Sequence, residues 1–332
     1  MGSTPRRTAV VLASLFVIVA LPASAWAAST QTLAKRGAAY LVTQQKSNGS
    51  IPAFSNVGST ADAILAFQAA AVGGRAETAA IGFLKAKTQA GKVTTLGLES
   101  KVVLALDAAG KDPGAFGGHD LVGQIESTLA PNGRYGTDPL LEDALAVLAV
   151  VSAGDTVPTK ASTWLIDGQC PDGGWAYDEP YNPSTDDAHC NSGSSDFYNS
   201  DSNTTSYVVQ ALEATGHTGW AVSPFSFFDT VRDAVHGGWS YDQSFVSTDA
   251  NSTALVLQAY AAAHVAVPKG ALAALRDLQY QSCGAWAYTW SETSPGPPDV
   301  GATIGAIPGL LLAPLPIAHT AITQGTPTVP SC

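Results

Sequence analysis

Two similar segments place an aspartate two residues before an asparagine and next to serines and threonines. They are Asp201-Ser-Asn203-Thr-Thr and Asp249-Ala-Asn251-Ser-Thr. A carboxyl group can act as a general acid when its pKa lies near the working pH, whereas a side-chain amide carries no proton of that acidity. Asp, Asn, Ser and Thr also cap helices, because their oxygens accept hydrogen bonds from free N–H groups at a helix start. We expect Asp201 and Asp249 to be helix caps.

An irregular acidic stretch from residue 178 to residue 201 is the second candidate for chemistry. Oxygen-rich irregular segments can hold calcium, and aromatic rings beside carboxylates can line a ligand site; a solvated acidic loop is the alternative. Asp187-Ala-His189-Cys190 contains three types of zinc ligand, although a disulfide is the favoured role for Cys190. Asp186 and Asp187 are the candidates for catalysis and for metal ligation. The carboxylates and aromatic residues of this stretch are Asp178, Glu179, Asp186, Asp187, Asp196 and Asp201, with Tyr177, Tyr181, Phe197 and Tyr198.

The elements that must position these residues form a repeat of helix, glycine-rich turn and helix. Clear copies of the turn span residues 169–177, 236–241 and 281–288, and weaker copies begin near residues 44, 89 and 132. The second helix of each unit is apolar on nearly every face, so it should be buried on every face. Six units of this kind predict an all-α fold, an α/α toroid with an inner and an outer ring of helices. An open solenoid would repeat in the same way.

Aromatic residues follow the glycines in the three clear turns. If these rings face solvent at one mouth of the toroid, they are candidates for ligand binding; packing at the turns is the alternative. The six residues are Trp175, Tyr177, Trp239, Tyr241, Trp286 and Tyr288.

The turn Gln169-Cys-Pro-Asp-Gly-Gly-Trp175 resembles the repeat of squalene and terpenoid cyclases and of prenyltransferase β-subunits. Residues 281–286 are a degraded copy, and residues 236–239 keep Gly-Gly-Trp. The resemblance implies the toroid fold. It also implies a site, because class II cyclases carry an Asp-x-Asp-Asp-Thr-Ala motif whose middle aspartate protonates the substrate. Asn203 and Asn251 occupy that position here, so protonation chemistry is not expected from them. Vitamin B12 carriers, thioester domains and some secreted polysaccharide lyases have a similar toroid.

The first residues are typical of a secretory signal peptide. Arg6 and Arg7 precede an apolar run from residue 9 to residue 20, and Ala25-Trp26-Ala27 is typical of a cleavage site. We therefore expect a leader at 1–27, a single toroid domain at 28–332 with the acidic insertion at 178–201, and a secreted protein. The net charge of −11 and the scattered Lys and Arg residues argue against a nucleic-acid partner. Prolines interrupt the apolar segment at 304–316, so we expect the last inner helix and a closing segment there, and no membrane span.

The chain contains four cysteines and no Cys-x-x-Cys pair, which in an exported protein indicates disulfides. Four cysteines allow three connectivities. We favour Cys170–Cys190, which would bracket the acidic stretch, and Cys283–Cys332, which would tie the last residue to the body of the protein.

The leading hypothesis for function is non-catalytic binding of an apolar small molecule, isoprenoid-like or a corrin, inside the toroid or at its mouth. A terpenoid cyclase-like enzyme with its acid elsewhere is the first alternative, with Asp62, Asp143, Asp186 and Asp187 as candidate acids. A secreted polysaccharide lyase or hydrolase is the second, and a purely structural or protein-binding module is the third.

Overall fold

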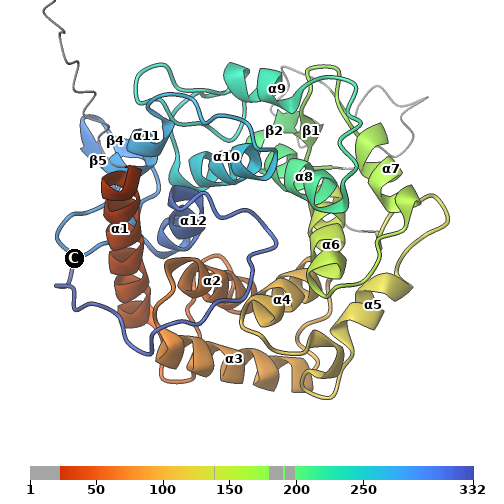
Figure 1. The fold of residues 1–332 in the computed structure, drawn as a ribbon, viewed down its shortest axis with the longest axis horizontal. Helices are drawn as coiled ribbons and strands as arrows, with labels where there is room; N and C mark the ends of the chain where they lie inside the picture. The colour runs from red at the N-terminus through yellow and green to blue at the C-terminus, as the bar shows by residue number, and fades with distance from the viewer. Residues whose placement is uncertain (1–22, 138, 179–189, 191–198) are drawn as a thin grey trace, which may run out of the picture.

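The computed structural model describes residues 23–137, 139–178, 190 and 199–332, and this part of the chain forms two concentric rings of helices (Figure 1). The outer helices are α1 (Ala23–Gln44), α3 (Gly74–Gln89), α5 (Leu121–Ser127), α7 (Thr159–Asp167), α9 (Pro224–Thr230) and α11 (Ala271–Asp277). The inner helices are α2 (Asn56–Ala70), α4 (Leu96–Ala108), α6 (Leu140–Ser152), α8 (Ser202–Thr215), α10 (Ala250–Ala262) and α12 (Val300–Leu310). A single turn of 3-10 helix, η1 (Pro113–Ala115), precedes α5.

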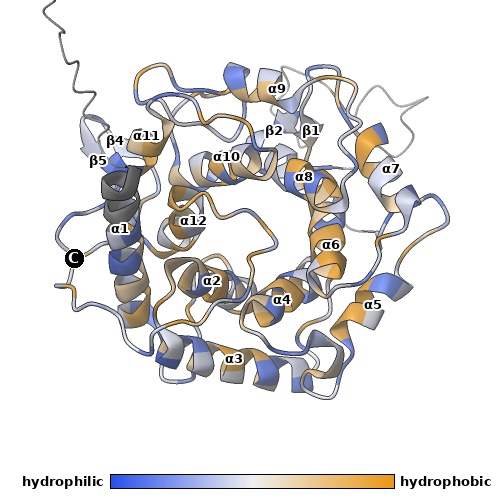
Figure 2. Ribbon diagram, viewed as in Figure 1, coloured by the Kyte–Doolittle hydropathy of each residue, from blue (hydrophilic) through white to orange (hydrophobic). Residues whose placement is uncertain are grey.

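The ring is closed. Each inner helix packs against the next, and α12 packs against both α2 and α1, so the last hairpin meets the first. The inner helices are apolar along most of their length, while the outer helices carry polar residues on the side facing away from the ring (Figure 2). The predicted all-α toroid of six helical hairpins is therefore confirmed, and the open solenoid is excluded.

Short antiparallel strand pairs join the turns to the inner helices. In the first pair, β1 (Trp175–Ala176) pairs with β2 (Ser200–Asp201), and Trp175 lies opposite Asp201. In the second, β3 (Trp286–Ala287) pairs with β6 (Pro298–Asp299). The third is a small hairpin of β4 (Trp290–Ser291) and β5 (Ser294–Pro295). The first two pairs fix each tryptophan beside the cap of the following inner helix.

A glycine with a left-handed backbone occupies the equivalent turn position in all six units. Gly284 shows why: its φ is +83°, and a Cβ there would lie 2.5 Å from the carbonyl oxygen of Arg36 in α1. Only glycine permits both the positive φ and the close backbone approach. Gly49, Gly133 and Gly173 meet the backbone of the next unit in the same way, whereas Gly91 and Gly237 share the positive φ without a close backbone contact.

A glutamine side chain connects three of these turns to the next unit, at its outer helix or just before it. Gln169 Nε2 donates to the carbonyl oxygens of Gly173 and Val222, at 2.9 and 2.6 Å. In the last unit Gln279 Nε2 donates to Gly284 and, across the closure of the ring, to Leu33 in α1. The prediction that aligned Gln281 with Gln169 was wrong by two residues, because the last turn is one residue longer than the motif.

The aromatic residue of each clear turn is buried between the two rings. Trp175, Trp239 and Trp286 are each 0% exposed. Their indole Nε1 atoms donate to carbonyl oxygens at the ends of the preceding outer helices, at 2.6, 3.0 and 2.8 Å. Their backbone N–H groups donate to a threonine hydroxyl on the following inner helix, at 2.9, 2.9 and 2.8 Å. Each tryptophan thus connects an outer helix to its inner partner.

Both predicted disulfides are present. Cys170 is bonded to Cys190 and Cys283 to Cys332, with Cα–Cα distances of 5.3 and 5.1 Å. The second bond ties residue 332 to the turn before α12. Among the described residues, no helix combines the length and the apolar character needed to cross a bilayer.

Candidate ligand-binding cavity

A cavity of about 240 Å³ lies inside the inner ring. Near its mouth it is lined by residues in the first turn of α8, α10 and α12, namely Asn203, Asn251 and Gly301. The side chain of Phe54, 81% exposed, also lines this end. The cavity therefore opens at the N-terminal ends of the inner helices. Its apolar lining consists of Leu65, Leu104, Leu141, Leu145, Leu255, Ile304, Pro308, Leu315 and Ile317, together with Phe54.

The C-terminal segment closes the opposite end of the cavity. After α12 the chain lies inside the ring (Figure 1), and Leu315 and Ile317 form part of the cavity lining. Three glutamines on the inner helices hold this segment: Gln258 donates to the carbonyl of Ala313, while the Oε1 atoms of Gln210 and Gln68 accept from the backbone N–H groups of residues 315 and 320, at 2.8 and 3.2 Å. The segment after α12 therefore forms the floor of the cavity, opposite its mouth.

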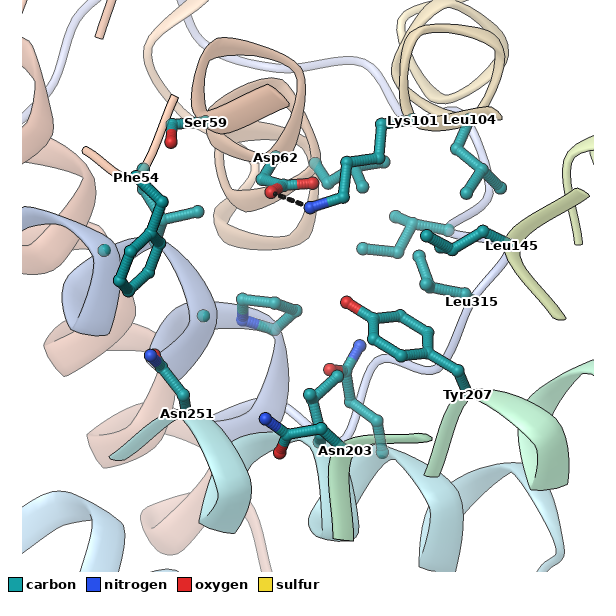
Figure 3. A pocket seen from close by; sticks show the side chains of 18 of the residues that line it. Phe54, Ser59, Asp62, Lys101, Leu104, Leu145, Asn203, Tyr207, Asn251 and Leu315 are labelled. Atoms are coloured by element: carbon teal, nitrogen blue, oxygen red, sulfur yellow. Dashed lines mark hydrogen bonds and ion pairs between the residues drawn. The ribbon is translucent and has the colours of Figure 1, made fainter. Parts of the chain in front are cut away.

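An ion pair forms part of the cavity wall. Lys101 Nζ on α4 is 2.7 Å from Asp62 Oδ2 on α2, and the two side chains are 27% and 29% exposed (Figure 3). Burial alone lowers the pKa of the Lys101 ammonium, but the carboxylates of Asp62 and Glu142 and the nearby Tyr207 raise it, and the net direction is upward. Lys101 is therefore charged at neutral pH and forms an ion pair with the Asp62 carboxylate.

Further polar groups face the pair across the cavity. Figure 3 shows the Tyr207 ring on the opposite wall with its hydroxyl pointing into the cavity. Burial is the main reason that the pKa of Tyr207 is raised, so its hydroxyl is protonated and can donate as well as accept. Asn203 and Asn251, in the first turns of α8 and α10, also line the cavity (Figure 3), and Asn203 Oδ1 has no hydrogen-bond partner among the described residues.

The residues predicted to carry acid chemistry fall in different places. Asp62 lines the cavity. Asp143 is 1% exposed and accepts from the backbone N–H of Tyr135 and from Trp164 Nε1, at 2.6 and 3.3 Å. It occupies the position that a threonine holds in the tryptophan-containing units, which makes it a structural acceptor. Asp186 and Asp187, and with them the predicted calcium or zinc ligands and His189, lie outside the described residues.

The six predicted ligand-binding aromatic residues do not line the cavity. The three indoles are fully buried behind the inner ring. Tyr177 and Tyr241 are half-buried, and Tyr288 is 44% exposed. The carbonyl oxygens of Tyr241 and Tyr288 accept from the first N–H groups of α8 and α10, at 2.8 and 2.7 Å. A ligand inside the cavity would not contact the indoles.

Asp201 and Asp249 are helix caps, as predicted. Asp201 Oδ1 accepts from the N–H of Thr204 and Asp249 Oδ1 from that of Ser252, both at 2.7 Å. Burial raises the pKa of Asp201 to about 7 and that of Asp249 to about 6, although the capping hydrogen bonds favour the charged forms. Neither carboxyl lines the cavity, so neither is positioned to protonate a molecule bound there.

The raised pKa of Asp201 predicts a pH-dependent stability. The folded protein holds this proton more tightly than the unfolded chain, whose ordinary aspartate pKa is 3.8, so stability falls as pH rises from about 4 to about 7. Asparagine also caps helices and carries no charge at any of these pH values. We expect Asp201→Asn to stabilise the protein at pH 8 by about 4 kcal/mol and to change its stability little at pH 4. Urea unfolding at both pH values measures this; an equal loss of stability at both would contradict it.

Sequence reasoning missed Lys101 and Tyr207. A signal was present: Lys101 lies in a helix predicted to be apolar on nearly every face, as does Asp62. Charges on a helix of that kind must be paired, because an unpaired buried charge is costly. Two opposite charges on consecutive inner helices therefore predict an ion pair inside the ring.

No protein-family model matches the chain, and no curated protein matches its sequence. Solved structures match its fold. The type II terpene cyclase MstE from Scytonema, in complex with its product merosterolic acid A, aligns with a TM-score of 0.56 at 12% identity, covering 88% of this chain and 99% of the cyclase.

Two proteins of carbohydrate chemistry are similarly close. A D-mannose isomerase aligns with a TM-score of 0.60 at 11% identity, covering 88% of this chain and 99% of the isomerase. An α-1,6-mannanase, GH76A of Salegentibacter sp. HEL1_6, aligns with a TM-score of 0.53 at 11% identity over 86% of this chain and 98% of the mannanase. The TM-scores show that the toroid fold is shared. Because the sequence identities are only 11–12%, the similarity says nothing about activity, which has to be inferred from the residues of the cavity.

Proposed function

We propose that this protein binds one small, largely apolar molecule in the central cavity and releases it unchanged. The observation that carries the proposal is the cavity lining: leucine and isoleucine side chains surround a single neutral ion pair, and amides occupy the positions where the resemblance to cyclases implies an acid. Ligand cavities are typically apolar with a few polar groups that fix orientation.

The volume argues for a small ligand. Pockets for drug-sized molecules span about 300–1,000 Å³, and this cavity has about 240 Å³. A short isoprenoid fits this limit better than a corrin, which is far larger.

A cyclase mechanism lacks its acid. Protonation of an alkene needs a carboxyl group that holds its proton until the substrate is in place. Within the described lining the carboxyl group is Asp62, and it is engaged in an ion pair with the ammonium of Lys101 at 2.7 Å. Asn203 and Asn251 have no acidic proton. The cavity wall that carries Asn203 and Asn251 at the positions of the cyclase motif can therefore bind a ligand, but it has no acid to protonate one.

Glycoside hydrolysis is also disfavoured. Most glycoside hydrolases use two carboxyl groups on opposite sides of the scissile bond. In the part of the chain that the structure describes, the cavity lining contains one carboxylate, Asp62, and it is paired. Binding outside the cell is part of the proposal, and the two disulfides are consistent with an oxidising compartment.

Native mass spectrometry tests the proposal. The protein is incubated with geraniol or limonene, the mass of the complex is measured, and the ligand is then extracted and analysed by gas chromatography. We expect an adduct of one ligand per chain and recovery of the unchanged molecule. Absence of an adduct with both probes would count against binding, and recovery of a cyclised or hydrated product would establish an enzyme instead.

A further inference from the structure

The charges of the cavity constrain the ligand more tightly than its volume does. Lys101 and Asp62 are the charged residues of the described lining, and they neutralise each other at 2.7 Å. Glu142 is also near Lys101, but one of its carboxylate oxygens accepts from the N–H of Gly97 at 2.9 Å, in the first turn of α4. The positive end of the helix dipole offsets that charge. The cavity wall is thus close to electrically balanced.

A charged ligand would disturb this balance. An added carboxylate or ammonium group would leave one charge without a counterion among leucine side chains, and burying an unpaired charge is unfavourable. An entirely apolar ligand would remove water from the pair and from Tyr207 without replacing its hydrogen bonds. A neutral group that both donates and accepts hydrogen bonds avoids both costs.

A hydroxyl group has these properties. It can donate to a free lone pair of Asp62, and it can accept from Lys101, whose ammonium has three N–H groups and gives one to Asp62. The Tyr207 hydroxyl, on the facing wall (Figure 3), can supply a further hydrogen bond in either direction. Leu104 and Leu145 line the wall beside the pair and offer contacts for an apolar chain.

We infer that the cavity selects a small apolar alcohol, with the Asp62–Lys101 pair and Tyr207 recognising its hydroxyl group. This inference rests on the proposed function and narrows it to a ligand class. Asp62 and Lys101 are then specificity-determining residues, since together they set the charge of the head group that the cavity accepts.

Three probes with the same carbon chain test the inference on the unaltered protein: geraniol, geranic acid and geranylamine, titrated by calorimetry at pH 7. We expect geraniol to bind at least about tenfold more tightly than either charged analogue, a factor that corresponds to about 1.4 kcal/mol. Equal or tighter binding of either charged analogue would overturn the inference and leave the proposed binding function intact. Failure of all three to bind would overturn both.

Variants that remove one charge of the pair provide a second test, because the two variants should shift the ligand preference in opposite directions. Asp62→Asn leaves the Lys101 charge without a partner, so we expect the preference to shift to geranic acid by at least about tenfold; Lys101→Met should shift it to geranylamine. The matched control is Asp277→Asn, which removes a carboxylate that is 52% exposed on the outer helix α11 and should leave the preference unchanged. An unchanged preference in correctly folded Asp62→Asn and Lys101→Met would overturn the inference. If these variants do not fold, the comparison of the three probes on the unaltered protein still decides it.

Discussion

Gly305→Leu is expected to weaken the binding of geraniol by at least about a hundredfold, which corresponds to about 2.8 kcal/mol. Gly305 lies on the cavity face of α12. A Cβ placed there meets Asn251 Oδ1 at 3.2 Å, and this atom is the far end of a side chain that can move. A leucine side chain would extend from this point into the space that the ligand needs. Calorimetric titration measures the loss.

The expected loss of binding is not a loss of folding. Gly305 is inside a helix, and leucine is a better helix former than glycine by several tenths of a kcal/mol. This position differs from Gly309, one turn later, where a Cβ would lie 2.5 Å from the Cα of Ala254 and would push α12 away from α10. Thermal unfolding of Gly305→Leu should therefore remain close to that of the parent protein.

Gly82→Leu is the matched control. Gly82 is also a helical glycine, in the outer helix α3, and a Cβ there has no neighbour within 4 Å. The variant gains the same helix propensity and leaves the cavity untouched, so its affinity for geraniol should equal that of the parent. If Gly305→Leu binds geraniol as tightly as Gly82→Leu does, the ligand does not occupy the central cavity.

Trp239→Ala is expected to destabilise the protein by about 4 kcal/mol, the range typical of a fully buried aromatic residue. The Trp239 side chain is 0% exposed, packs beside Tyr260 with a ring-centroid distance of 5.7 Å, and donates from Nε1 to the carbonyl of Phe228 at 3.0 Å. Alanine would leave a cavity between the two rings of helices and a carbonyl oxygen without its partner. Urea unfolding measures the change.

Trp220→Ala provides the comparison. Trp220 lies in the connection between α8 and α9 and is only partly buried. We expect its replacement to cost less than half as much as that of Trp239, since less apolar surface is removed from the core. Similar losses for both variants would mean that Trp239 has no special role in joining the rings.

Much of this architecture could be predicted from the sequence, because it is encoded locally. The turn glycines are recognisable because glycine is the residue that adopts a positive φ without strain, and at Gly49, Gly133, Gly173 and Gly284 another backbone also lies too close for a side chain. Asp201 and Asp249 could be assigned as caps because a cap acts within three residues of itself. The two disulfides followed from the spacing of four cysteines, although spacing alone left other pairings open.

The assignment of the turn aromatics shows where local pattern stops being informative. A Gly-Gly-Trp turn fixes the backbone, but it does not indicate whether the indole points to solvent at the mouth or inward between the rings. In Trp175, Trp239 and Trp286 the decision depends on the threonine of the next helix and on a carbonyl of the preceding one. These contacts are tertiary, and no single turn of the sequence displays them.

The cavity itself depends on contacts between distant residues. Lys101 meets Asp62 across 39 residues, and Gln210 accepts from residue 315 across 105. The sequence predicted that residues 304–316 would form the last inner helix and a closing segment, and the structure agrees. It did not predict that this segment would return into the ring and become the floor of the cavity.

The most direct test of the account is methyl NMR of the protein with ¹³C-labelled leucine and unlabelled geraniol. If geraniol binds inside the ring, intermolecular NOEs are expected to the methyl groups of Leu104, Leu145 and Leu255, which line the cavity on three inner helices. No NOEs are expected to Leu165 or Leu275, which are buried behind the inner ring on α7 and α11. Binding of geraniol without NOEs to the three cavity leucines would contradict the central claim that the ring encloses the ligand site.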